Sequence, residues 1–283
     1  MNYKIFQICF EQNQISQVDS LLTPFDNTKN ERPELREFHS FNRIIDEGFA
    51  NDLDAWGVFG PRWQDKMRHS SQVIVDAIKD NPNADVWIFN HARVQDAFMY
   101  NVWEQGEYFH KGIREVTAAA LKAGGYDTTA LEVVMTDATC YCSYFVATKA
   151  FWLDYIAFVK DVKEKLEALT GREAELYHGS ANYGRDPNLN MFPFIVERLF
   201  STFLHMKVPA FSRGFIYRKY KIYSRKYDYS VYKPQVNDFY KIIESMNELK
   251  RLTLTQNSPE LFQQWSTLRM YFVKKYPELF NLD

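Results

Sequence analysis

The stretch Ala55-Trp56-Gly57-Val58-Phe59, followed at once by Gly60-Pro61, decides the fold class. Its short apolar run predicts a buried strand, and the Gly-Pro pair predicts where that strand stops. Similar strands are expected at Lys4–Phe10, directly at the N-terminus, and at Asp85–Asn90. Between and after them the apolar residues recur with a helical spacing. Strands that alternate with helices predict an α/β, Rossmann-like fold with a mostly parallel sheet flanked by helices.

The other elements follow from the same reasoning. A long polar loop is expected over residues 11–34, and residues 93–106 read as helix and loop. Two further strands are expected at Glu132–Thr136 and Tyr141–Ala147. We place a domain with the sheet at residues 1–207, and a basic, aromatic segment with closing helices at 208–283. The expected helices cover residues 34–49, 70–79, 110–122, 151–169, 191–206, 237–252 and 259–276.

The composition excludes several classes of protein. The 283 residues are 46% hydrophobic and 25% charged, which is ordinary for a globular chain with a large core. No apolar run is long enough to span a membrane. Three cysteines with no zinc-like spacing predict a cytoplasmic protein with free thiols. A net charge of −2 argues against a general nucleic-acid binder, and no phosphate loop or serine-hydrolase motif occurs.

Ligands of such sheets bind beyond the carboxyl ends of the strands, so the polar segments there are the candidates for a site. In the first loop Asp26 and Asn27 can hydrogen-bond a base or ribose, and Arg32 and Arg36 can hold a diphosphate. The alternative is a solvated loop with a helix-capping carboxylate. Beyond the next strand Arg62 and Lys66 are placed to bind an anion. The alternative there is a pair of surface residues.

The strand that ends in Asn90-His91 bears on metal binding. Many sugar-nucleotide enzymes carry two carboxylates at such a strand end, where they hold Mn²⁺ or Mg²⁺ on the diphosphate. Neither position is acidic here, and Asp52-Leu53-Asp54 precedes a strand, so we interpret it as a solvated turn. We therefore predict that no metal site is built and no cofactor is obligatory, with Arg and Lys holding the diphosphate. Mn²⁺ or Mg²⁺ stays open as an assisting ion.

A second group of polar residues suits an acceptor sugar. Glu104, Glu107 and His110 can converge in a turn as a metal or sugar-hydroxyl site, or His110 can simply cap the next helix. Asp137 follows an expected strand and can act as a hydrogen-bonding or basic group. Cys140 and Cys142 have no visible activating partner, and we interpret both as structural.

The pair Glu197-Arg198 interrupts an otherwise apolar helix. Charged residues in such surroundings are either a structural ion pair or part of a site. The sequence leaves both open.

The region from Pro209 to Pro234 is basic and rich in tyrosine. Such a stripe suits single-stranded RNA or an anionic membrane that carries a pyrophosphate lipid. A packed basic hairpin is the plain alternative, and the net charge of the whole chain favours an enzyme over an RNA-binding protein. The residues that we expect to contact the membrane or carrier are Arg218, Lys219, Arg225 and Lys226.

Together these stretches resemble bacterial glycosyltransferases of the GT-A type, in particular small enzymes of capsule and lipopolysaccharide O-antigen loci. The resemblance covers roughly residues 1–207. It departs from the wider GT-A pattern in lacking an Asp-x-Asp at the strand end. The stretches that carry it are the N-terminal strand, Trp56–Lys66, Asp85–Asn90, Tyr141–Trp152 and the helix with Pro193–Arg198.

The resemblance implies transfer of a sugar from a nucleotide donor, a UDP-sugar first, to a growing glycan that is surface-bound or lipid-linked at the inner membrane. It implies a catalytic carboxylate beside the anomeric carbon, for which Glu197 or Asp137 fits. On the donor side it places Asp26, Asn27, Arg32, Arg36, Trp56, Arg62, Lys66, Asn90 and His91. On the acceptor side it places Glu104, His110, Tyr144 and Arg198.

Overall fold

The computed structural model describes residues 1–67, 69–90, 92–135, 139–181, 186, 188–211, 220–224 and 236–275. At 93, 207–211, 220–224 and 236–240 it describes the backbone alone.

One sheet organises the described part of the chain, with the strand order β2-β1-β3-β5-β4-β6. Every neighbouring pair is parallel except the two that involve β5, which runs antiparallel to β3 and β4. The expected α/β fold with a mostly parallel sheet flanked by helices is confirmed. The strands are β1 (Tyr3–Cys9), β2 (Thr23–Asp26), β3 (Ala55–Phe59), β4 (Val86–Asn90), β5 (Phe145–Thr148) and β6 (Tyr220–Ser224).

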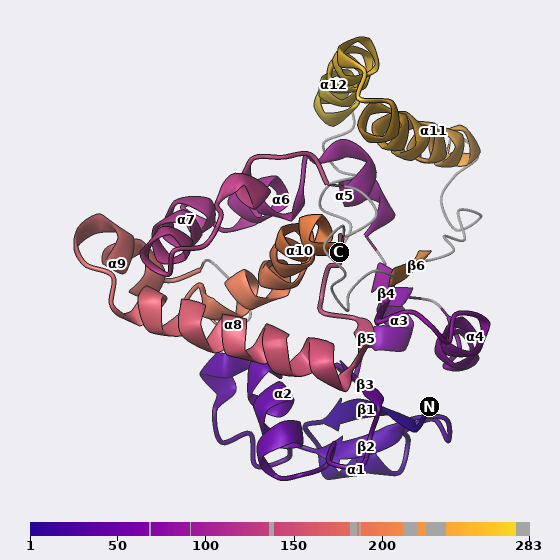
Figure 1. Cartoon of the computed structure of the whole chain (residues 1–283), viewed down its shortest axis with the longest axis vertical. Coiled ribbons are helices and arrows are strands. Elements are labelled where there is room, and N and C mark those ends of the chain that lie inside the picture. Colours follow the sequence, from indigo (N-terminus) through magenta and orange to yellow (C-terminus); the bar gives the residue numbers. More distant parts are fainter. Residues whose placement is uncertain are drawn as a thin grey trace.

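Helices cover both faces of this sheet (Figure 1). α2, α8 and α10 pack on one face with α7 behind them, and α3 and α4 pack on the other. α11 and α12 form a separate pair that packs on α5. The helices are α1 (Gln12–Ile15), α2 (Glu37–Asp46), α3 (Trp63–Met67), α4 (Gln72–Asp80), α5 (Arg93–Phe98), α6 (Val102–Phe109), α7 (Ile113–Ala123), α8 (Lys149–Glu167), α9 (Gly171–His178), α10 (Phe192–Phe211), α11 (Val236–Gln256) and α12 (Pro259–Lys275).

Aromatic rings fill the layer between the sheet and α8, which accounts for much of the aromatic content. Trp56 of β3 stacks on Trp152 of α8, with ring centroids 5.7 Å apart and planes 5° apart. Trp152 Nε1 also donates a hydrogen bond to the Trp56 carbonyl at 2.7 Å. Gly57 admits β5 beside β3, because a Cβ atom there would lie 2.8 Å from Val146 Cγ2.

The structure differs from the sequence expectations in several places. The loop expected at residues 11–34 contains the short helix α1 and the edge strand β2, and the strand expected at Tyr141–Ala147 begins only at Phe145. Residues 171–178, for which we expected no element, form the helix α9. The strand expected at Glu132–Thr136 is wrong for its described part, which is turn and coil. Asn101 Nδ2 donates hydrogen bonds to the carbonyls of Leu131 and Val133, at 3.1 and 2.9 Å. These carbonyls therefore bond to a side chain and not to a neighbouring strand.

The domain boundary expected at residue 207 lies inside α10, and β6 adds a strand to the sheet beyond it. The sheet is therefore not confined to residues 1–207. No helix in the described part of the chain has the length and apolar character needed to cross a bilayer.

We predict that Trp152→Ala lowers the free energy of unfolding by about 3–5 kcal/mol, because it removes a fully buried ring and leaves a cavity. Chemical denaturation measures the change. Leu153→Ala on the same helix is the control, since Leu153 is 46% exposed. It should stay within about 0.5 kcal/mol of the wild type. Equal losses in both variants would contradict this view of the core.

Candidate active site

The segment Thr139–Tyr144 forms the centre of the candidate site. It leads into β5, and because β5 is antiparallel to β3 and β4 its start lies at the carboxyl edge of both. Cys142 and Ser143 both have left-handed backbone conformations, with φ of +62° and +53°. Non-glycine residues persist in such conformations only where their surroundings hold them, and these positions cluster at functional sites.

Four neighbouring elements hold this segment. Cys140 N donates to Ser201 Oγ of α10 at 3.0 Å, and Lys66 Nζ of α3 donates to Cys142 Sγ at 2.9 Å. Phe89 N of β4 donates to the Tyr144 carbonyl at 2.8 Å. Thr139 Oγ1 donates to Asp96 Oδ1 of α5 at 2.7 Å. The segment is thus fixed at both ends and at its turn.

Charged side chains gather around the buried phenol of Tyr144. Burial raises the pKa of Tyr144 well above its usual range, and the nearby Cys142, Glu37 and Glu197 raise this pKa further, while Arg62 lowers it. Tyr144 therefore stays protonated at neutral pH and can donate a hydrogen bond. The structure brings together Arg62, Lys66, Tyr144 and Glu197 among the residues predicted from sequence.

Glu37 joins this group although the sequence analysis did not place it in a site. It is the first residue of α2, and its carboxylate reaches the end of β3, 3.6 Å from where a Cβ atom of Gly60 would lie. Glu37 is half-buried, and no hydrogen bond or ion pair joins it to another residue in the described part of the chain. Arg36, just before it, has φ of +49°, so this helix start is a second constrained backbone position.

The predicted donor loop at the ends of β1 and β2 is ordered by its own contacts. Asp26 accepts from Thr28 N and Oγ1 at 2.9 and 2.7 Å, and these bonds lower the pKa of Asp26. Asn27 is buried, and its Oδ1 accepts from Arg43 Nη1 at 3.2 Å. These side chains shape the loop, and their contact with a donor stays a prediction.

The two arginines predicted for this loop form ion pairs. Arg32 pairs with Glu34 at 2.5 Å, and both side chains are exposed. Arg36 Nη2 pairs with Asp186 Oδ2 at 3.1 Å, which ties the start of α2 to residues before α10. A diphosphate would have to compete with these carboxylates.

Two other predicted donor residues are buried. The Trp56 ring is 1% exposed and stacks in the core, so it offers no surface to a ligand. Asn90 is equally buried; its Nδ2 donates to Thr139 Oγ1 at 3.3 Å and its Oδ1 accepts from Ala92 N at 3.0 Å. Asn90 therefore joins the end of β4 to the Thr139–Tyr144 segment. The predicted residues His91, Asp137, Arg218, Lys219, Arg225 and Lys226 lie outside the described residues.

Glu197 and Arg198 point to different surroundings. The Glu197 side chain is 35% exposed and lies 3.8 Å from the Arg198 guanidinium. Arg198 is buried between α10 and α6, where it donates to the Val102 carbonyl at 2.9 Å and to the Gln105 side chain. A Cβ atom at Gly106 would overlap Arg198 Nε, so a larger residue there would force the buried Arg198 side chain to move. Arg198 thus supports the helix packing, while burial, with the charge of Glu197 adding to it, raises the pKa of Cys140 and of Tyr144.

His110 belongs to the same helix interface. It is buried, its ring stacks on Phe194 with centroids 3.8 Å apart, and Nδ1 donates to the Ala181 carbonyl at 2.7 Å. Burial lowers the pKa of His110 to about 4; the bond to Ala181 opposes this and the charge of Arg198 adds to it. His110 is neutral at physiological pH and packs behind the site.

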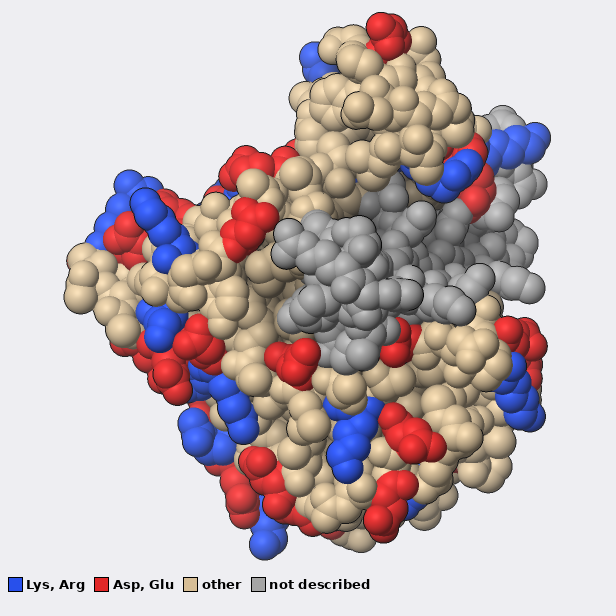
Figure 2. All heavy atoms as spheres, in the orientation of Figure 1, with Lys and Arg blue, Asp and Glu red and all other residues tan. Residues whose placement is uncertain are grey.

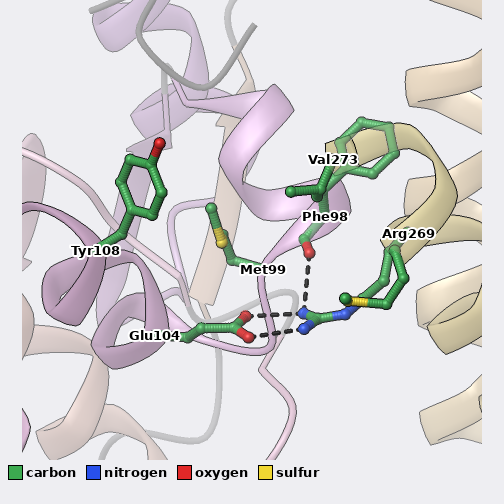
Figure 3. A pocket seen from close by; sticks show the side chains of 7 residues that line it. Phe98, Met99, Glu104, Tyr108, Arg269 and Val273 are labelled. Atoms are coloured by element: carbon green, nitrogen blue, oxygen red, sulfur yellow. Dashed lines mark hydrogen bonds and ion pairs between the residues drawn. The ribbon is translucent and has the colours of Figure 1, made fainter. Parts of the chain in front are cut away.

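Glu104 lies in a separate place, where α12 meets α6 (Figure 3). Its carboxylate forms a bidentate ion pair with the Arg269 guanidinium, at 2.7 and 2.8 Å, and accepts a hydrogen bond from Tyr100 N at 2.6 Å. The pair forms part of the wall of a mostly apolar pocket of about 210 Å³. The predicted acceptor residues are therefore not brought together: of the four, Tyr144 lies in the cluster with Glu37 and Glu197.

Among the described residues, no group of three or more His, Cys, Asp or Glu side chains is arranged to hold a metal ion. That no metal is obligatory stays a prediction from the sequence. Asp52-Leu53-Asp54 precedes β3, at the opposite edge of the sheet, and Asp54 Oδ2 accepts from Asn2 N at 2.6 Å.

Comparisons with known proteins give one distant likeness. No family model and no curated protein matches the sequence. The apo structure of the WbbM bifunctional glycosyltransferase is similar to this chain with a TM-score of 0.49 and 14% sequence identity. The match covers 79% of this chain, which spans 44% of that structure's chain.

The neutral state of His110 predicts a pH dependence of stability. The folded protein keeps His110 neutral to a pH of about 4, whereas the unfolded chain takes up this proton near pH 6.5. Between these values the unfolded state binds more protons than the folded state. The contribution of His110 to the free energy of unfolding is therefore complete above about pH 6.5 and is lost as the pH falls toward 4. His110→Phe should therefore flatten the fall in unfolding free energy from pH 6.5 to 4.

Urea titrations at several pH values measure this slope, and the change in slope is compared, not absolute stability, because the variant also leaves the Ala181 carbonyl without its partner. His178→Phe, at an exposed position, is the matched control and should keep the wild-type slope. An unchanged slope in His110→Phe would contradict the prediction.

Proposed function

We propose that this protein is a glycosyltransferase that moves a sugar from a nucleotide-sugar donor to a surface or lipid-linked glycan. Among the nucleotide sugars, a UDP-sugar is the donor that we favour. The observation that carries the proposal is the cluster of half-buried Glu37 and Glu197 around buried Tyr144, with Arg62 and Lys66 beside it at the carboxyl edge of a mostly parallel sheet. Ligands of such sheets bind at this edge. The sequence resemblance to GT-A enzymes supports the same reaction.

The cluster contains the groups that this reaction requires. Arg62 and Lys66 stabilise the negative charge that grows on the leaving diphosphate. Glu197 supplies a negative charge. It serves as the carboxylate beside the anomeric carbon, or as the base that takes the proton of the acceptor hydroxyl. The anomeric configuration of the product distinguishes the two roles of Glu197.

Glu37 has a proposed role as well. A carboxylate without a partner among the described residues is suited to accept hydrogen bonds from the hydroxyl groups of a sugar. Because it begins α2 directly after the ion-paired Arg36, it connects the candidate donor loop with the Tyr144 cluster. Neither carboxylate is proposed as a metal ligand.

The alternative of an RNA-binding protein has less support. On the face shown in Figure 2, the described Lys and Arg side chains are interspersed with Asp and Glu and form no single basic stripe. The basic segment that carries the alternative lies largely outside the described residues. Its contact with the inner membrane stays a proposal.

A panel of nucleotide sugars tests the donor class. We expect one of the UDP-, GDP-, CMP- or dTDP-sugars to raise the melting temperature. At about 100 times its Kd the ligand should add roughly 2.7 kcal/mol to the unfolding free energy. Single-stranded RNA in a filter-binding assay is the comparison. Binding of RNA without any response to the nucleotide sugars would overturn the proposal.

Glu197→Gln tests the catalytic carboxylate. With the donor identified, we expect turnover to fall by about 10² to 10⁴-fold while the melting temperature changes little, because the amide keeps the shape but not the charge or basicity. Glu164→Gln on α8 is the control, since Glu164 is exposed and should leave turnover unchanged. Near-full activity of Glu197→Gln would assign Glu197 to the ion pair with Arg198 alone.

A further inference from the structure

The C-terminal helix pair is attached to the rest of the chain by a buried lysine. The Lys250 side chain in α11 is 1% exposed. Its Nζ donates to the Asp96 and Met99 carbonyls, both at 2.7 Å, at the end of α5, and lies 3.8 Å from Asp96 Oδ1. A buried ammonium requires such partners, so Lys250 holds α5 and α11 in one geometry.

Asp96 continues the contact toward the candidate site. Its Oδ1 accepts from Thr139 Oγ1 at 2.7 Å, and Thr139 Oγ1 accepts from Asn90 Nδ2 at 3.3 Å. Thr139 and Asn90 are each 1% exposed, so these bonds are shielded from water. A chain of polar groups therefore runs from α11 to the carboxyl end of β4.

Thr139 is also the first residue of the segment that contains Cys142 and Tyr144. Because Cys142 and Ser143 have left-handed conformations, this segment depends on its attachments for its shape. The bond from Thr139 to Asp96 is one of these attachments, and Asp96 is in turn held by Lys250.

We infer that the C-terminal helix pair, α11 and α12, holds the candidate site in its geometry. Lys250 is a positioning residue: through Asp96 and Thr139 it fixes the segment Thr139–Tyr144, and with it the place of Tyr144 at the start of β5. The consequence of this positioning for sugar transfer rests on the proposed function.

The chain offers a matched control in Arg269 of α12. It attaches the same helix pair through Glu104 and the Phe98 carbonyl, the latter at 3.0 Å. In the described part of the chain, no hydrogen bond joins it to Thr139 or Asn90. Lys250→Met and Arg269→Met both weaken the helix pair. Lys250→Met alone removes the support for the polar chain to β4.

Reactivity of the Cys142 thiol measures the segment without any substrate. Cys142 is half-buried, whereas Cys9 and Cys140 are buried, so a disulfide reagent of the dithionitrobenzoate type should modify Cys142 first; Cys142→Ser identifies its signal. In the full-length protein we expect Lys250→Met to speed this modification by about tenfold, since the loss of a buried partner favours local opening. Arg269→Met should stay within about twofold of the wild type, and Lys250→Arg should restore most of the protection.

A second variant keeps the inference testable if Lys250→Met does not fold. Thr139→Val removes the hydroxyl between Asp96 and Asn90 but leaves the contacts of Lys250 with the two carbonyls, and it should also expose Cys142. Equal modification rates in the Lys250→Met and Arg269→Met variants, or wild-type rates in Thr139→Val, would overturn the inference.

A transfer assay then tests the consequence for catalysis. Lys250→Met should lower kcat by at least about tenfold with a smaller change in the KM of the donor, while Arg269→Met of similar melting temperature keeps kcat. Equal kcat in the two variants would overturn the positioning role. If no donor is found at all, the proposed function fails, and the thiol measurements still decide the structural inference.

Discussion

The antiparallel insertion of β5 between β3 and β4 is the constraint on which the site depends. A parallel strand there would place its carboxyl end at the edge where β3 and β4 end. Because β5 runs the other way, that edge receives the segment before it, Thr139–Tyr144, and the following helix α8 starts at the opposite edge. Gly57 permits the close approach of β5, and the stack of Trp56 on Trp152 fixes α8 over it.

Charges in this protein separate into two kinds by their surroundings. Arg198, Lys250 and Arg269 are buried, and each directs its donors at carbonyl oxygens or at a side chain on a neighbouring helix. Such groups are costly to desolvate and are retained where they fix one packing geometry. Glu37 and Glu197 are only half-buried and lie at the sheet edge, where a ligand can reach them. The buried arginines and lysine hold helices together, whereas the half-buried glutamates keep part of their carboxylates exposed to solvent.

Three constrained backbone positions lie in the candidate site. Arg36 precedes Glu37, and Cys142 and Ser143 precede Tyr144, and all three have positive φ without being glycine. The strain is balanced by attachments from α3, α5, α10 and β4. The helix pair α11–α12 takes part in this through Lys250, so a region that looks like an appendage in Figure 1 contributes to the order of the sheet edge.

The sequence by itself determined the strands at β1, β3 and β4 and the main helices, because apolar periodicity and the Gly-Pro stop are local signals. It also placed Arg62 and Lys66 among the candidates, since polar residues that follow buried strands meet at one edge. Glu197 was a candidate because a charged pair interrupts an apolar helix, and Tyr144 because of the resemblance to GT-A enzymes. It could not show that Trp56 and Asn90 are buried, or that Arg198, His110 and Glu104 serve helix packing. It also missed β2, which pairs with β1, and Glu37, whose neighbours Gly60 and Tyr144 lie just after β3 and just before β5. Those outcomes depend on which side chains meet across the fold, and only the tertiary structure decides this, because burial and partners come from residues far apart in the chain.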